Sequence, residues 1–297
     1  MNIKRTLKDL WRLIYPVIIY FAVAFIVQFA AVRVIASAAV ANGTITAAGK
    51  STAELQEELN SLINRYGLHL TALTNVVLIP IYILLLMGDE KKRRNSLGIR
   101  YTTPGIKRLG VVFVLGMSAA VSVNVIVSLS QIARFSPKYQ QVSEVIYSGG
   151  LFMEIVSAVI AAPILEELFF RGMIYKRLQD MINVKAAVIV SALFFGAFHG
   201  NLVQFVYAFI IGLMLAYVYE KFKTIWAPVI FHIGANLISV LITEFMPQSM
   251  NDAAVILGAM LISMVLTFVL LKYVYGYNAG SVSVQKYPEL KIRRQLA

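Results

Sequence analysis

The sequence contains no cysteine and few charged residues. The absence of cysteine excludes disulfides, cysteine-ligated zinc and a cysteine nucleophile. Only 14% of the 297 residues are charged, 59% are hydrophobic, and the mean hydropathy is +0.74. This balance excludes a soluble globular protein. The formal net charge of +12 does not indicate nucleic-acid binding, because the basic residues lie between apolar runs, where they orient helices in a bilayer.

Long apolar runs predict an all-α polytopic membrane protein with about eight transmembrane helices, because a spanning helix needs roughly 20 apolar residues. The runs begin near Leu13, Leu68, Leu109, Leu151, Lys185, Leu202, Thr224 and Ala253. With a cytoplasmic N-terminus, 22 of the 27 basic residues fall on the cytoplasmic side. The outer segments keep Arg33, Lys50, Arg65, Arg134 and Lys138. We therefore expect a multi-pass protein with both termini in the cytoplasm, and the short loops favour a bacterial plasma membrane.

The chain is expected to have three parts. Residues 1–150 hold three transmembrane helices and an outer loop, residues 151–240 a catalytic core, and residues 241–297 the last transmembrane helix and a basic cytoplasmic tail. Ala36-Ser37-Ala38 after the first run is typical of a signal-peptide cleavage site. That run is longer than the usual apolar core of roughly 7 to 15 residues, so we expect a retained helix. In the outer loop, Ser51 and Glu54 predict a capping box that opens an amphipathic helix on the membrane surface.

Ionisable side chains stand inside the predicted fourth helix. Each costs roughly 2.5 to 3.5 kcal/mol on insertion scales, so such groups usually face a cavity or one another. Two adjacent carboxylates, Glu166 and Glu167, are followed by Arg171. Glu167 and Arg171 are spaced i, i+4 in the order that favours an ion pair. Because neighbouring helix residues point about 100° apart, Glu166 must face a different neighbour.

Two of the three histidines also lie in apolar runs. The predicted fifth helix contains Phe195 and His199, and the seventh contains His232 and Asn236 at i, i+4. One helix face thus presents an imidazole and an amide one turn apart. Glutamate, histidine and asparagine side chains can together activate a water molecule and stabilise an oxyanion.

The motifs EExxxR, FxxxH and HxxxN, in this order, resemble those of the CPBP family of intramembrane proteases, which includes the type II CAAX prenyl proteases and bacterial bacteriocin-processing and self-immunity proteins. The resemblance covers about residues 151–239, with each motif intact. It implies an endopeptidase that cleaves a membrane-associated, lipidated or leader peptide. By this resemblance, Glu166 and His199 would activate water, and His232 and Asn236 would stabilise the oxyanion. Glu167 and Arg171 would support the site.

The same family is also described as metalloproteases. Glu166, His199 and His232 could therefore instead hold one divalent metal such as zinc, with an open position for water. The sequence leaves both mechanisms open. The expected partners are a peptide or protein substrate, with or without a lipid, and membrane lipids, but no nucleic acid. Prenylated CAAX proteins, peptide pheromones and bacteriocin leaders are the substrates that the resemblance suggests.

Each polar residue also has a structural interpretation. Glu167 with Arg171 could be only an ion pair, and Asn236 could only bridge helices. We expect helix bridging of three further amides, Gln28, Asn75 and Asn124. Two other ionisable residues are expected near the outer interface, where water solvates them, and receive no function: His69 and Glu154.

Other protein classes fit the sequence less well. The zinc signature HExxH is absent, and Ser118 has no dedicated partner. The aspartates lie in loops or at helix boundaries: Asp9, Asp89, Asp180 and Asp252. A non-enzymatic immunity or scaffold protein could use the same fold to bind a peptide, although a binder has no need of buried titratable groups. A transporter would show repeat symmetry and paired broken helices, and the sequence shows neither.

Overall fold

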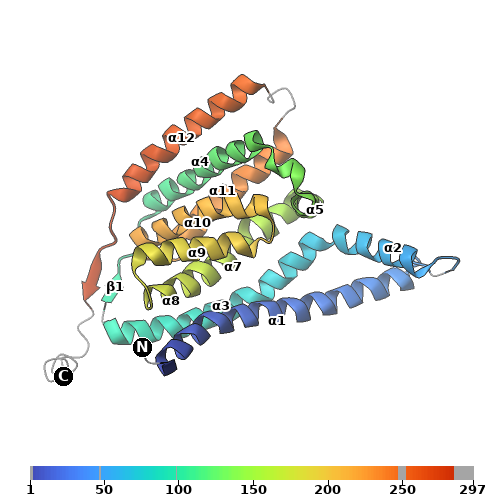
Figure 1. The fold of residues 1–297 in the computed structure, drawn as a ribbon, viewed down its shortest axis with the longest axis horizontal. Coiled ribbons are helices and arrows are strands. Elements are labelled where there is room, and N and C mark those ends of the chain that lie inside the picture. The colour runs from blue at the N-terminus through green and yellow to red at the C-terminus, as the bar shows by residue number, and fades with distance from the viewer. Residues whose placement is uncertain (1–2, 47, 98, 247–251, 284–297) are drawn as a thin grey trace.

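The computed structural model of the protein describes residues 3–46, 48–97, 99–246 and 252–283. Within these residues, six helices are long and apolar enough to cross a membrane (Figure 1). They are α1 (Ile3–Ala41), α3 (Gly67–Leu97), α4 (Ile106–Ser130), α10 (Leu202–Phe222), α11 (Trp226–Phe245) and α12 (Ala253–Tyr275). A seventh span results if α5 (Pro137–Tyr147) and the segment Leu151–Gln179 count as one span, which bends by 104°. The all-α membrane fold is therefore confirmed.

All eight predicted apolar runs are helical, although two differ from an ordinary span. The fifth run is α9 (Val184–Phe198), which has only 15 residues and ends just before His199. The fourth is a continuous helix with changing hydrogen-bond pattern. It consists of α6 (Leu151–Met153), the π-helix η2 (Glu154–Ala161), α7 (Ala162–Glu167), the π-helix η3 (Leu168–Tyr175) and α8 (Lys176–Gln179). The α-helical turn that carries both glutamates thus lies between two π-helical stretches, a feature often found at functional sites.

The predicted amphipathic helix is present as α2 (Thr52–Arg65), at the end of the molecule where α1 ends and α3 begins (Figure 1). Its capping box is confirmed, because the Ser51 hydroxyl accepts from the Glu54 N–H at 3.3 Å and the Ser51 N–H donates to the Glu54 carboxylate at 2.7 Å. A short 3-10 helix, η1 (Ile132–Phe135), leads from α4 into α5.

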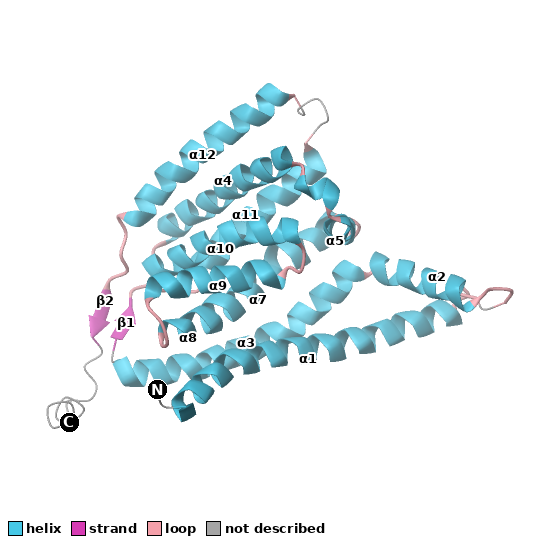
Figure 2. Ribbon diagram, in the orientation of Figure 1, coloured by secondary structure: helices cyan, strands magenta, loops and turns pink. Residues whose placement is uncertain are grey.

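Contacts at the opposite end of the bundle bring several helix ends together. Strand β1 (Ile99–Tyr101) follows α3 and pairs antiparallel with β2 (Ser281–Ser283), beyond α12 (Figure 2). The Lys221 ammonium at the end of α10 donates to the Tyr275 carbonyl at 2.8 Å. The ends of α3, α10 and α12 therefore share one side of the bundle, as the predicted eight-span topology requires. The tail residues Lys286, Lys291, Arg293 and Arg294 lie outside the described residues.

Helices α4 and α11 cross at glycines. A Cβ atom on Gly116 would lie 2.0 Å from the Phe231 carbonyl oxygen, and one on Gly234 would lie 2.4 Å from the Phe113 carbonyl oxygen. Both distances are far inside van der Waals contact, so only glycine allows the two backbones to approach this closely. Because Phe231 and Gly234 flank His232, this crossing fixes the position of that histidine.

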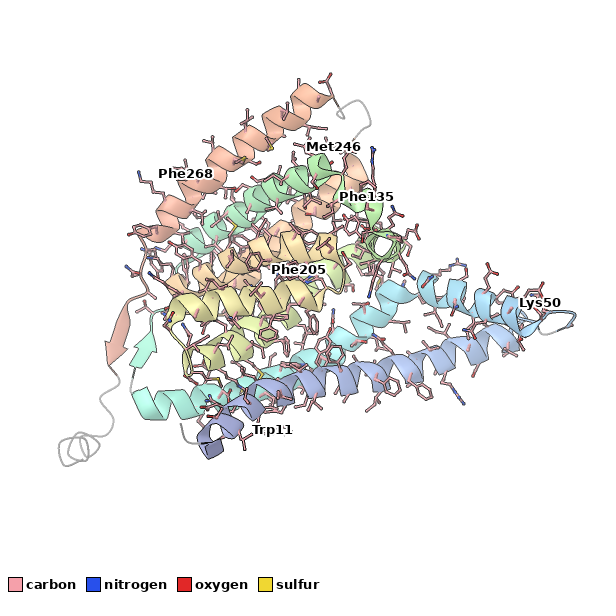
Figure 3. The ribbon with its side chains drawn as sticks, in the orientation of Figure 1. Trp11, Lys50, Phe135, Phe205, Met246 and Phe268 are labelled. Atoms are coloured by element: carbon pink, nitrogen blue, oxygen red, sulfur yellow. The ribbon has the colours of Figure 1, made fainter. Side chains whose placement is uncertain are left out.

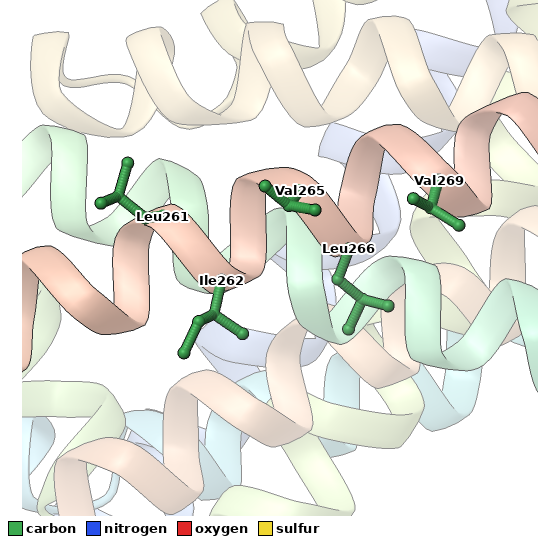
Figure 4. Close-up of a pocket in the computed structure, with 5 residues that line it drawn as sticks. All are labelled: Leu261, Ile262, Val265, Leu266 and Val269. Atoms are coloured by element: carbon green, nitrogen blue, oxygen red, sulfur yellow. The ribbon is translucent and has the colours of Figure 1, made fainter.

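The outer faces of α1 and α12 are apolar and exposed. Phe268 on α12 is 70% exposed and points away from the bundle (Figure 3). A shallow hollow on α12 is lined only by aliphatic side chains (Figure 4). They are Leu261, Ile262, Val265, Leu266 and Val269. Such faces suit contact with lipid chains, and no ionisable group lines this hollow.

Candidate active site

Glu167 and Arg171 form the buried base of the candidate site. The Arg171 Nη1 atom lies 2.8 Å from Glu167 Oε1, and both side chains are completely buried, which confirms the predicted ion pair. The second Arg171 nitrogen, Nη2, donates to the Gly212 carbonyl on α10 at 2.9 Å. The guanidinium also lies 4.6 Å from the centre of the Phe195 ring. The pair therefore joins η3 to α9 and α10, and a buried arginine gains both charge and hydrogen-bond compensation.

His232 lies between the two glutamates. Its Nδ1 atom is 3.1 Å from Glu167 Oε1, and its Nε2 atom is 3.8 Å from Glu166 Oε2. A carboxylate only accepts, so Nδ1 carries the proton that is donated to Glu167. The two glutamates thus face opposite nitrogens of one imidazole, as their 100° separation on the helix predicted. Glu166 is the more accessible of the two, with 23% of its side chain exposed against 0% for Glu167.

His199 reaches the site through Phe195. Its Nδ1 atom lies 2.8 Å from the Phe195 carbonyl oxygen, so Nδ1 is the donor, and Nε2 of the neutral ring is an acceptor. The Phe195 ring makes edge contacts with both imidazoles, at centroid distances of 5.1 Å to His199 and 5.7 Å to His232. The structure shows no ion pair between His199 and Glu166. The Phe195 ring therefore spaces the two histidines around the same site.

Asn236 binds a backbone group rather than another site residue. Its amide nitrogen donates to the Ala158 carbonyl in η2 at 2.8 Å. This contact holds α11 against the helix that carries the glutamates, one helical turn from His232. The helix bridge predicted as one alternative for Asn236 is thus present in the structure. An amide has two N–H bonds, and one is enough for Ala158.

The other predicted bridging amides behave differently. The Asn124 amide donates to the Ser239 hydroxyl at 2.8 Å and bridges α4 to α11, as predicted. The Asn75 amide nitrogen is buried without a hydrogen-bond partner among the described residues. Gln28 is exposed on α1 and bridges no helices in this part of the chain, so that prediction is wrong. The later part of α1, which carries Gln28, diverges from the site helices (Figure 1).

The expectation for Glu154 is also wrong. Its side chain is completely buried, and neither carboxylate oxygen has a hydrogen-bond partner among the described residues. The sequence placed it at the interface because it stands near the start of its helix. In the structure, α5 folds back at 104° and α3 packs along η2, so both cover this position. His69, by contrast, is exposed, as expected.

Two tyrosines near the site carried no recognisable sequence signal. Tyr207 on α10 packs against His199 with a centroid distance of 6.4 Å, and Tyr20 on α1 packs against Phe198 at 4.8 Å. Tyrosine is common in membrane helices, and neither residue has a motif spacing to the glutamates or histidines. Sequence patterns alone could not have found them.

The possible metal ligands are Glu166, His199 and His232. Glutamate and two imidazoles are a ligand set that zinc accepts, and each histidine has an outer partner for its Nδ1 atom, as metal-bound histidines usually do. However, no three histidine, aspartate or glutamate side chains in the described ranges are grouped closely enough to hold one ion. The chemistry of the ligands fits a metal, but their spacing in this structure does not.

Comparison with known proteins places this part of the chain. Residues 148–238 match the family model described as "Type II CAAX prenyl endopeptidase Rce1-like". The matched segment includes all three motifs and every predicted site residue. This segment is similar to the Rce1-like family. The resemblance inferred from the motifs is thereby confirmed, whereas the roles of individual residues stay predictions.

A curated protein similar to this chain comes from Bacillus subtilis (strain 168). It is named "Putative membrane peptidase YdiL" and is 30% identical over 134 residues, which are 43% of this chain and 54% of the relative. The chain thus spans about half the length of the curated relative that it matches. No solved structure matches the chain. The similarity supports a protease-like membrane protein, whose activity and substrate are taken up below as proposals.

Proposed function

We propose that the protein is an intramembrane endopeptidase that hydrolyses a peptide bond of a membrane-associated, lipidated or leader peptide. One observation carries the proposal. Oε2 of Glu166 is buried without a hydrogen-bond partner among the described residues and lies 3.8 Å from Nε2 of His232, whose other nitrogen is held by the buried Glu167. A separation above 3.5 Å is too long for a direct hydrogen bond and suits two groups that share a water molecule or a substrate atom.

In the proposed reaction, Glu166 is the general base. The attacking water gives a proton to the Glu166 carboxylate while its oxygen bonds to the carbonyl carbon of the substrate. Nε2 of His199 accepts a hydrogen bond from the second O–H of that water, which stays on the attacking oxygen, because Nδ1–H of His199 is committed to the Phe195 carbonyl. The Phe195 contact thus determines which nitrogen of His199 faces the reaction.

The oxyanion of the tetrahedral intermediate needs donors in a site with little water. We assign this role to Nε2–H of protonated His232 and to the second amide N–H of Asn236. Collapse of the intermediate breaks the carbon–nitrogen bond, and the proton held by Glu166 moves to the leaving nitrogen. Glu167 accepts the Nδ1–H bond of His232 and stabilises its protonated ring in a fixed orientation, as the buried carboxylate does in serine protease triads, and Arg171 holds Glu167 in place.

The cellular setting is proposed on the same basis. The Rce1-like segment and the apolar helices suit a peptide substrate that lies in or on the membrane, and the exposed faces of α1 and α12 contact lipid. The distribution of basic residues favours both termini in the cytoplasm, and the short loops favour a bacterial plasma membrane.

The test uses purified full-length protein in detergent with a panel of quenched fluorescent peptides, lipidated and not. Glu166→Gln keeps the shape of the side chain and removes the base, so we expect hydrolysis to fall at least about 10²-fold. Glu154→Gln is the matched control, because it makes the same change at a second glutamate of the same long helix, outside the site. Wild-type rates for Glu166→Gln would exclude it as the base, and a protein inactive on every peptide would favour a peptide-binding or immunity protein.

A metal mechanism is decided in the same assay. The wild-type protein is incubated with a strong chelator, desalted and assayed with and without added zinc. Our proposal expects full activity after chelation. Loss of activity that zinc restores would instead show that Glu166, His199 and His232 come together around an ion.

A further inference from the structure

Tyr20 brings helix α1 into contact with the site helices. Its ring packs edge-on against Phe198 of α9 at a centroid distance of 4.8 Å. It also packs, at a tilt, against Phe169 of η3 at a centroid distance of 5.8 Å. Phe198 immediately precedes His199, and Phe169 lies two residues beyond Glu167. A residue of the first helix, far outside the Rce1-like segment, therefore lies beside the two helices that carry the predicted catalytic groups.

The ring of Tyr20 continues an aromatic series that ends at the histidines. Phe198 contacts Phe170 at 5.4 Å, and Phe170 contacts Phe195 at 5.0 Å. Phe195 in turn packs against both His199 and His232. Edge contacts between rings favour defined orientations. Tyr20 and Phe198 thus form the end of this series that lies toward α1.

This end of the series is accessible, unlike the base of the site. Glu167 and Arg171 are fully buried, and His232 is 6% exposed. Glu166, His199, Tyr20 and Phe198 are all half-buried. Tyr20 and Phe198 are therefore accessible beside His199, the residue that follows Phe198.

Hydrogen bonds to the first turns of α1, before Tyr20, hold this residue in place. One turn earlier, the Pro16 carbonyl accepts a hydrogen bond of 2.6 Å from the buried Tyr82 hydroxyl of α3. The Arg177 guanidinium of α8 donates to the Arg12 carbonyl and to the Tyr15 hydroxyl. These bonds tie the beginning of α1 to the catalytic helix and to α3.

Beyond Tyr20, α1 diverges from the site helices (Figure 1). Phe21 still touches Phe198 at 5.8 Å but is 57% exposed, and Phe25 is 69% exposed. Tyr20 is therefore at the last turn of α1 that packs into the aromatic series. A substrate side chain that displaced this turn would not have to break the bonds at Arg12 and Pro16.

We propose that Tyr20, together with Phe198, determines substrate specificity by contacting a bulky apolar side chain next to the scissile bond. This inference rests on the proposed peptidase function, because it places the substrate at Glu166. The Tyr20 ring limits the size of the side chain that fits between α1 and α9. A small residue at position 20 would enlarge this space and favour larger side chains.

The kinetic test compares unlipidated peptides that differ only in one residue beside the cleaved bond, from alanine to phenylalanine. For Tyr20→Ala, we expect the kcat/KM ratio of the phenylalanine peptide to the alanine peptide to rise about 10-fold or more. Tyr20→Phe keeps the ring and should keep the wild-type ratio. Phe25→Ala is the control on the exposed part of α1 and should also keep it. An unchanged ratio in Tyr20→Ala would overturn the proposal while leaving the peptidase function intact.

A binding experiment separates this proposal from catalysis. A photocrosslinking phenylalanine analogue is placed at position 20 or at position 25 in the Glu166→Gln protein, which is then irradiated with the phenylalanine peptide. Crosslinking from position 20 and not from position 25 supports the contact, even if the wild-type protein hydrolyses nothing. Crosslinking from position 25 alone, or from neither position, overturns it.

Discussion

His232 donates from Nδ1 to the buried Glu167 carboxylate, across 3.1 Å and a sequence separation of 65 residues. The same oxygen of Glu167 pairs with Arg171. A carboxylate that could have been only half of a local ion pair therefore also orients an imidazole from another helix. Glu167 therefore has both of its predicted roles, as ion-pair partner and as supporting residue of the site. Its negative charge neutralises Arg171 and also keeps a proton on Nδ1 of His232.

The first prediction concerns this shared carboxylate. Glu167→Gln leaves Arg171 buried without a counter-charge. The new amide N–H can donate to Nδ1 of His232, which would remove the proton that Nδ1 carries in the wild-type protein. We expect kcat to fall roughly 10²- to 10⁴-fold. Because one partner of a buried ion pair is removed, stability should fall by about 3 to 5 kcal/mol. Peptide hydrolysis and thermal unfolding in detergent measure the two effects.

The control for Glu167 is the partly exposed pair between Lys50 and Glu58, whose side chains lie 2.5 Å apart outside the site. Glu58→Gln should change stability by less than about 1 kcal/mol and leave activity unchanged. Wild-type kcat in a well-folded Glu167→Gln protein would contradict the role assigned to Glu167.

The second prediction separates the two interpretations of Asn236. Asn236→Ala removes both its bond to the Ala158 carbonyl and the proposed oxyanion donor, so kcat should fall about 10²-fold. Asn124→Ala is the matched variant, because it also removes an amide bridge to α11, at Ser239, but lies outside the site. It should lose about 1 kcal/mol of stability and keep its kcat. Equal losses of kcat in both variants would show that Asn236 only bridges helices and does not stabilise the oxyanion.

The third prediction concerns the glycine crossing of α4 and α11. Gly116→Ala places a methyl group 2.0 Å from the Phe231 carbonyl oxygen, so the helices must separate and shift the adjacent His232. We expect lower thermal stability and a lower kcat. Gly110→Ala, on the same helix with open space around it, should affect neither. If Gly116→Ala unfolds and hydrolyses peptides like the wild-type protein, the crossing does not fix the histidine.

The fourth prediction is a pH effect at α2, outside the spanning helices. The Ser51 N–H and hydroxyl stabilise the charged Glu54 carboxylate and hold its pKa below the usual range. A lowered pKa means that the capping contribution is complete above the unfolded pKa of about 4.3 and is lost as pH falls through the folded pKa. Hydrogen exchange of α2, corrected for intrinsic rates, should therefore speed up below about pH 4.

Two variants check this assignment. Glu54→Gln should abolish the pH-dependent part of the protection, because the capping carboxylate is gone. Glu57→Gln, in the same helix but outside the capping box, should keep it. A wild-type α2 whose protection does not change between pH 7 and pH 3 would show that the carboxylate form of Glu54 adds nothing to the helix.

Much of the architecture could be predicted from the sequence. Eight apolar runs became helices because a bilayer accepts backbone only in a form that satisfies its own hydrogen bonds. The Glu167–Arg171 pair and the capping box of α2 could also be predicted, because both depend on spacings within one helix. The burial of Glu154 could not, because it depends on the angle at which α5 folds back and on packing against α3, which is distant in sequence.

The sequence by itself determined which chemical groups are available. Charge inside apolar runs is costly, so Glu166, Glu167, Arg171, His199 and His232 stood out wherever they lay in the chain. Only the tertiary structure decided how they meet. The glycine crossing of α4 and α11 sets the depth of His232, and Tyr20 reaches the site because Arg177 and Tyr82 hold the start of α1. Such contacts follow from packing between helices, which leaves no periodic trace in any one helix.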